Sequence, residues 1–64
     1  MEITHEIAQT IHPDSPILTA YESGRVRAFR GLAEPAGATQ DLRRGYHDAE
    51  MEMQAEEGGN GNAT

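Results

Sequence analysis

The sequence predicts an all-α protein: a short N-terminal helix, or a strand in its place, then an antiparallel pair of helices and a disordered C-terminal tail. Apolar residues recur at helical spacing over two segments, about 16–31 and 40–56, which supports the helical pair. A stretch containing Pro and Gly separates the two segments. We therefore expect an N-terminal element over 1–12, a helical hairpin over 16–56 and a tail over 57–64.

Composition limits the size of the core. The chain has 64 residues, a formal charge of −6, five arginines, no lysine and no cysteine. Only 14 apolar residues are larger than alanine, so the chain lies near the boundary between folded and disordered proteins. Disulfides and thiolate metal sites are excluded because cysteine is absent. One small domain is expected, stabilised by a second copy of itself or by a partner.

The N-terminal element carries isoleucines at positions i, i+4 and i+8, namely Ile3, Ile7 and Ile11. This spacing places them on one stripe of a short helix, with Thr4 as its N-cap. The β-branched residues also fit a strand, so both alternatives stay open. Pro13 ends whatever precedes it, since the residue before a proline is pushed out of the helical region.

The first long helix is expected to begin with Ser15 as N-cap and Pro16 at its first position, and to end near Gly31. Gly24 lies inside it; a glycine costs roughly 1 kcal/mol there relative to alanine, yet it lets another backbone approach closely. The wide apolar face of this helix comprises Ile17, Leu18, Tyr21, Ala28, Phe29 and Leu32.

The second long helix is expected to begin at the N-cap Thr39. Its apolar residues are spaced by four, three and four positions: Leu42, Tyr46, Ala49 and Met53. That alternation is a narrow seam of the coiled-coil type. Two heptads are short for a stable coiled coil, which favours packing of the seam inside the hairpin.

Two segments share a local pattern, Ala20-Tyr21-x-x-Gly24 and Gly45-Tyr46-x-x-Ala49. Each places a tyrosine between small residues, and the simple explanation is that the ring lies flat where its neighbours leave room. In these segments the chain resembles the small accessory proteins of phages that infect high-GC bacteria. The resemblance implies a protein that acts on a host protein or the virion, in the host cytoplasm, and it transfers no site residues.

Charged residues are distributed unevenly. All the basic residues fall between 25 and 44, at the loop end of the expected hairpin: Arg25, Arg27, Arg30, Arg43 and Arg44. The second helix then carries an acidic patch free of bases: Asp48, Glu50, Glu52, Glu56 and Glu57. The pattern predicts a dipolar molecule whose acidic end steers it to a basic surface, although charge runs often serve solubility alone.

Arg25 falls inside the apolar face of its helix. It must extend to solvent, pair with a carboxylate, or stack on an aromatic ring. Because Arg and Tyr are enriched in interface hot spots, this face is also a candidate interface. Its expected members, with those of the seam, are Tyr21, Arg25, Phe29, Leu42, Tyr46 and Met53.

Catalysis and cofactor chemistry find no support in the sequence. His47 and Glu50 have a spacing that can share a metal, but one such pair supplies too few ligands. No signal peptide and no apolar run of about 18 residues is present, so we expect a cytoplasmic protein that does not enter a membrane.

Three functions follow from these patterns. The first is a non-enzymatic protein-interaction module, in a phage context one that binds and inhibits a host protein. The second is a structural homo-oligomer or virion component built on the seam. The third is nucleic-acid binding through the arginines, against which the net charge of −6 argues.

Overall fold

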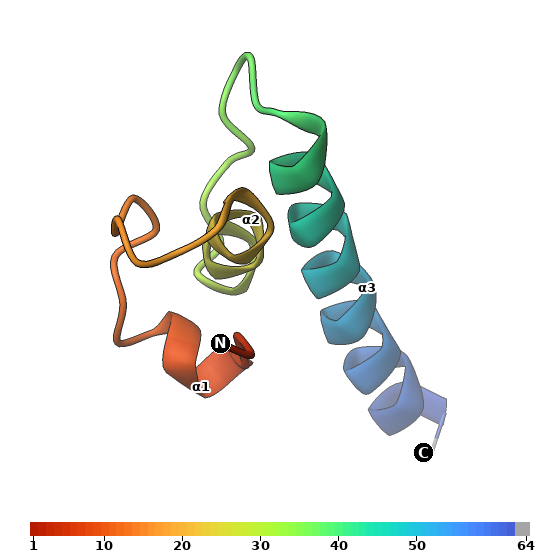
Figure 1. Cartoon of the computed structure of the whole chain (residues 1–64). Helices are drawn as coiled ribbons and strands as arrows, with labels where there is room; N and C mark the ends of the chain where they lie inside the picture. Colours follow the sequence, from red (N-terminus) through yellow and green to blue (C-terminus); the bar gives the residue numbers. More distant parts are fainter. Residues whose placement is uncertain (63–64) are drawn as a thin grey trace.

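The computed structural model describes the backbone of residues 1–62 and the side chains of residues 1–56. Three helices follow one another, α1 (His5–Ala8), α2 (Ala20–Phe29) and α3 (Gln40–Asn62), and this part of the chain contains no strand (Figure 1). The predicted all-α class is confirmed. The order is also as expected, with a short first helix and two longer ones that pack against each other.

Helix α1 resolves the alternative left open for the N-terminal element in favour of a helix. Thr4 is its N-cap, as predicted, and its hydroxyl accepts a hydrogen bond from Ile7 N at 3.2 Å. The helix is a single turn, and a turn this short has no stability of its own. Its position therefore depends on contacts with the rest of the protein.

Helix α2 begins four residues later than predicted, at Ala20. Residues 15–18 form a turn instead, with Leu18 N donating to Ser15 O at 3.1 Å, so the predicted cap at Ser15 is wrong. Thr19 is the N-cap: its hydroxyl accepts from Glu22 N at 3.1 Å, and the Glu22 carboxylate accepts from Thr19 N at 2.8 Å. This reciprocal pair satisfies two otherwise unpaired amides, which explains why the helix begins here.

The end of α2 agrees with the sequence prediction. Gly31 has φ of +75°, a left-handed conformation that favours glycine. Leu32 N donates to Arg27 O at 2.9 Å and Gly31 N donates to Ala28 O at 3.1 Å. This is a Schellman motif, which ends the helix by using its last carbonyls.

Helix α3 begins as predicted, with the Thr39 hydroxyl accepting from Leu42 N at 3.2 Å. Its backbone continues to Asn62, beyond the predicted end at 56. The glycines there cost helix stability but, unlike proline, do not prevent a helix. The expected disordered tail, 57–64, falls largely outside the described residues. The structure describes the backbone but not the side chains of 57–62, and it does not describe 63–64.

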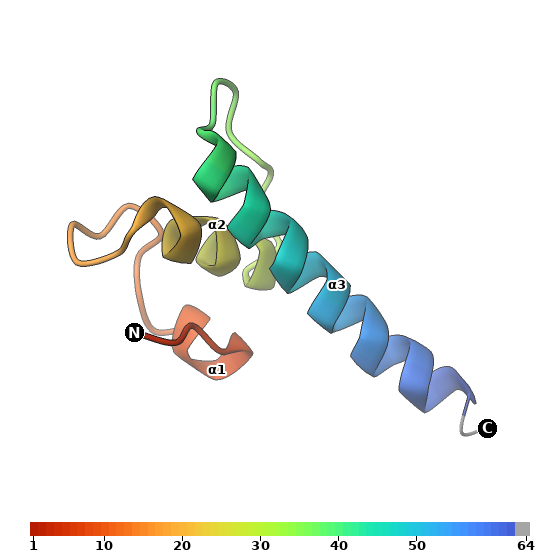
Figure 2. The same cartoon turned by 45° about the vertical axis from the view of Figure 1, so that its right-hand side comes forward.

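Helices α2 and α3 cross steeply rather than running antiparallel side by side (Figure 2). The Tyr21–Asp48 and Arg25–Glu52 contacts advance by one turn in the same direction along both helices, so the expected antiparallel arrangement of the pair is wrong. Glycines mark the crossing on both helices. A Cβ at Gly24 would lie 2.8 Å from Tyr46 N, and one at Gly45 would lie 2.8 Å from Tyr21 C. The close approach expected at Gly24 is confirmed, and Gly45 repeats it from the opposite side. Each glycine is followed four residues later by a buried alanine, Ala28 and Ala49.

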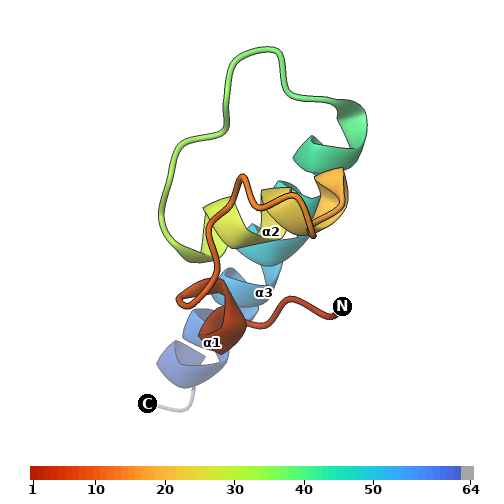
Figure 3. The same ribbon diagram turned by 60° about the vertical axis from the view of Figure 1, so that its left-hand side comes forward.

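The core lies where the N-terminal segment covers the crossing helices. Ile3 is only 1% exposed, and it packs with Val26 and Phe29 of α2 and with Ala49 of α3. The chain between α1 and α2 runs back along α2 (Figure 3). Four side-chain hydrogen bonds hold it there: from Gln9 Nε2 to Phe29 O at 3.2 Å, from Arg30 Nη1 to Ile11 O at 2.9 Å, from Ser23 Oγ to Pro13 O at 2.6 Å and from Arg27 Nη2 to Asp14 Oδ1 at 2.7 Å.

Candidate functional site

Arg25 occupies the centre of the molecule. It points inward from α2 and is only 8% exposed. Its guanidinium carbon lies 5.1 Å from the centre of the Phe29 ring and 6.0 Å from that of Tyr21, within reach of cation–π attraction. Of the alternatives for this residue, extension to solvent is therefore wrong, whereas stacking on an aromatic ring and pairing with a carboxylate both occur.

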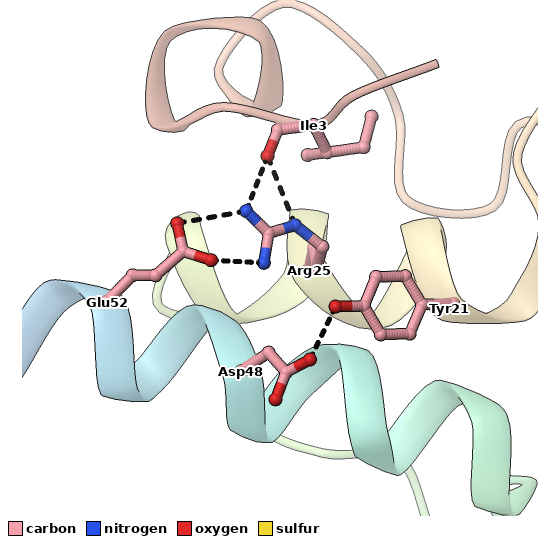
Figure 4. A network of polar contacts seen from close by, with 5 residues as sticks. All are labelled: Ile3, Tyr21, Arg25, Asp48 and Glu52. Atoms are coloured by element: carbon pink, nitrogen blue, oxygen red, sulfur yellow. Dashed lines mark hydrogen bonds and ion pairs between the residues drawn. The ribbon is translucent and has the colours of Figure 1, made fainter.

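The Arg25 guanidinium joins the three parts of the fold (Figure 4). Its Nε and Nη2 donate to Ile3 O at 3.1 and 2.9 Å. Its Nη1 and Nη2 donate to the two carboxylate oxygens of Glu52, on α3, at 2.6 and 3.0 Å. A two-oxygen pairing of this kind fixes the plane of the guanidinium, so Arg25 positions the N-terminal segment against both long helices.

The Arg25–Glu52 pair remains charged at neutral pH. The hydrogen bond from Arg25, with its nearby positive charge, lowers the pKa of Glu52 below its usual range despite some desolvation. Reciprocally, the hydrogen bond to Glu52 raises the pKa of Arg25. The Arg25 side chain is 10% exposed and that of Glu52 is 55% exposed, so water screens the glutamate side of the pair.

A second polar contact lies beside the first. The Tyr21 hydroxyl donates to Asp48 Oδ2 at 2.5 Å (Figure 4). This hydrogen bond, with burial and the nearby negative charge, raises the pKa of Tyr21. The phenol therefore stays protonated and remains a donor, and it ties α2 to α3 one turn before the Arg25–Glu52 pair.

The residues expected to form an exposed interface lie inside the fold. Arg25 and Phe29 are buried, and the other four are partly buried: Tyr21, Leu42, Tyr46 and Met53. Tyr46 and Met53 pack against the core, and the Tyr46 hydroxyl donates to Leu32 O at 2.7 Å. The narrow seam of α3 therefore packs inside the helical pair, as its short length suggested.

The expected basic patch is divided by the fold. Arg25 pairs with Glu52, Arg27 pairs with Asp14 at 2.7 Å, and Arg30 donates to Ile11 O. Only Arg43 and Arg44 remain together as exposed residues near the loop end of the hairpin. These separate roles could not be predicted from the sequence, because each partner is more than ten residues away along the chain.

The expected acidic patch is divided in the same way. Asp48 and Glu52 serve contacts within the molecule, whereas Glu50 and Glu56 have no ion pair among the residues whose side chains are described. The Glu57 side chain lies outside that part of the chain. Met51, which follows Glu50 directly, is 61% exposed. Its place outside the 42–46–49–53 seam was a readable signal that it faces away from α2.

Two further features of the site were missed in the sequence. The capping box of α2 was readable from its pattern, a Thr followed three residues later by Glu. The Ile3 carbonyl as an Arg25 acceptor was not readable, because a main-chain oxygen leaves no mark in the sequence. Glu22 is a buried carboxylate whose second oxygen pairs with the Met1 amino group at 3.0 Å.

Other kinds of site are not found in the described part of the chain. It holds no group of three or more His, Asp or Glu side chains placed to bind a metal ion. No helix within it combines the length and the apolar character needed to cross a bilayer. The comparisons with protein families, with curated proteins and with solved structures find no match to this chain.

Proposed function

We propose that the protein is a small non-enzymatic interaction module that binds a protein partner through the acidic part of α3 around Met51. The observation that carries this proposal is the 61% exposure of Met51 on a helix whose other apolar residues pack inward. Methionine is flexible and polarisable and is often used at protein-binding surfaces. Glu50 directly precedes Met51, and the chain contains no arginine after Arg44, so this half of α3 is acidic.

The arrangement of α3 supports the same surface. The half of the helix that follows the crossing extends past α2 (Figure 2). A partner with an apolar depression and a basic rim would accept Met51 and attract the carboxylates of this half of the helix. In a phage context, as the resemblance implies, the partner is a host protein and binding modulates it.

A capture experiment tests the proposal. The full chain, immobilised through a C-terminal tag, is exposed to a lysate of a high-GC bacterium, and bound proteins are identified by mass spectrometry. We expect a protein that Met51→Glu fails to capture, while circular dichroism shows the same helix content. Ile17→Glu is the matched control, because Ile17 is equally exposed, at 64%, but lies in the loop before α2. Equal capture by all three chains, or capture by none, would contradict the proposal.

No specific observation favours the other two functions. The seam on which a homo-oligomer was predicted is occupied by α2, so self-association would need another surface. Three of the five arginines expected to bind nucleic acid are engaged within the molecule. Both functions stay predictions.

A further inference from the structure

Two of the five arginines have no evident role in the fold. Arg25, Arg27 and Arg30 each donate to a protein oxygen at 3.1 Å or less. Arg43 has only a distant contact with Glu34, 3.7 Å from Nε to Oε1, which is too long for a hydrogen bond. Arg44 makes no ion pair with the residues that the structure describes. In a chain of net charge −6 without lysine, two such guanidiniums side by side call for an explanation.

These two arginines belong to one face of α3. With Gln40 and His47 they occupy positions i, i+3, i+4 and i+7, which share a face of a helix. The four side chains line an open concavity of about 550 Å³, which we call the α3 basic face. Its polar groups are two guanidiniums, an amide and an imidazole, a set rich in hydrogen-bond donors.

Helix stability does not explain their placement. Arg43 and Arg44 lie in the first two turns of α3, where the helix dipole carries partial positive charge. Cations there cost a few tenths of a kcal/mol each. Solubility does not require them either, since the chain is already strongly acidic. A group outside the chain is the remaining use for two adjacent, exposed guanidiniums.

We propose that the α3 basic face binds a compact phosphate group, a phosphomonoester on a small molecule. Guanidiniums bind phosphate oxygens in pairs, and a doubly charged phosphate can use donors from both arginines and from Gln40 or His47. A long polyphosphate chain fits less well, because its further charges would meet the acidic residues of the same helix, beginning with Asp41 and Asp48. This site goes beyond the proposed protein-binding surface and does not use Met51.

Ligand titrations of the full chain test the site. Chemical shifts of the backbone amides are followed while inorganic phosphate, adenosine monophosphate or a single-stranded oligonucleotide is added at constant ionic strength. We expect shifts centred on residues 40–47 with the first two ligands. Tighter binding of adenosine monophosphate than of inorganic phosphate would show that the ligand is a nucleotide. Equal affinities would show that only the phosphate group is recognised. Both results support the site.

Substitutions at the α3 basic face assign the binding. Arg43→Gln and Arg44→Gln should each weaken phosphate binding about tenfold to a hundredfold, the usual worth of one hydrogen bond to a charged group. Glu34→Gln should strengthen it, because the carboxylate that lies 3.7 Å from Arg43 Nε becomes neutral. Arg30→Gln and Met51→Glu are the matched controls and should leave it unchanged, which keeps this test separate from that of the protein-binding surface.

Three results would overturn the proposal. They are the absence of shifts at residues 40–47, an equal loss of binding in the Arg30→Gln control, and a tighter interaction with the oligonucleotide than with either small ligand. The last result would point to nucleic acid as the ligand. Arg43 and Arg44 are exposed, so their substitution leaves the core intact and a loss of binding cannot be assigned to unfolding.

Discussion

The Gly45→Ala substitution tests the steep crossing of α2 and α3. The new Cβ would lie 2.8 Å from Tyr21 C and 3.1 Å from Tyr21 Cα, whereas ordinary contacts begin at 3.4 Å. The neighbours are backbone atoms, which cannot rotate away as a flexible side chain can. The Tyr21 carbonyl oxygen would lie closer still, so the two helices must part by well over half an ångström, and the buried Ala28 and Ala49 lose contacts on either side.

The expected magnitude follows from two opposing effects. Overpacking in a tight core costs up to about 3 kcal/mol, and alanine returns about 1 kcal/mol through its better helix propensity. We expect the free energy of unfolding to fall by about 2 kcal/mol, a large share of the 3–5 kcal/mol at most that a domain of about this size has. Helix propensity alone predicts the opposite sign.

Urea unfolding followed by circular dichroism measures the change. Gln54→Ala is the matched control on the same helix, because Gln54 is exposed, and its effect should stay within about 0.5 kcal/mol. Gly24→Ala should reproduce the loss, since its Cβ would meet the backbone of α3. A Gly45→Ala protein as stable as the original, or more stable, would refute the crossing described here.

The remaining predictions concern the polar contacts. Arg25→Met should lower the free energy of unfolding by about 1–3 kcal/mol, because it leaves the Ile3 carbonyl buried without a donor. Glu52→Gln should lower it by about 1 kcal/mol or less, because water screens the glutamate. Equal effects of the two substitutions in urea unfolding would contradict this role of the Arg25–Ile3 contact. Because the pKa of Glu52 is lowered in the folded state, its ionised carboxylate stabilises the fold at any pH above the ordinary glutamate pKa, and this contribution is lost as the pH falls through the folded-state pKa. Glu52→Gln should therefore make the stability of the protein less dependent on pH in acid. An unchanged acid profile would argue against the pairing. Thr19→Ala should cost about 1 kcal/mol and Ser15→Ala much less, and the reverse order would place the start of α2 where the sequence alone suggested.

Local chemistry was readable from the sequence. Thr4 and Thr39 begin helices because their hydroxyls accept hydrogen bonds from main-chain amides of the first turn. Gly31 ends α2 because glycine readily adopts a positive φ. Gly24 was expected to permit a close backbone approach, and it does. The error at Ser15 arose because two caps competed within five residues, and the capping box at Thr19 satisfies more of the helix amides.

Contacts between distant residues were not readable. Arg25 was expected to need a partner, but Glu52 is 27 residues away and Ile3 contributes a main-chain oxygen. The repeated pattern of small residues and tyrosine contains Gly24, Gly45 and Ala49 of the crossing, but Ala28, the buried alanine four residues after Gly24, lies outside it. The charge pattern likewise concealed which arginines and carboxylates the fold would use.

In this structure the apolar, tyrosine-bearing faces pack within one chain, and the partner surface that we propose lies on the outer part of α3. Light scattering across a concentration series, with circular dichroism on the same samples, tests whether these faces also pack within one chain in solution. We predict a mass of 7.0 kDa and a helix content that do not change on dilution. A dimer or larger assembly whose helix content falls on dilution would contradict this packing, because those faces would then be buried between chains.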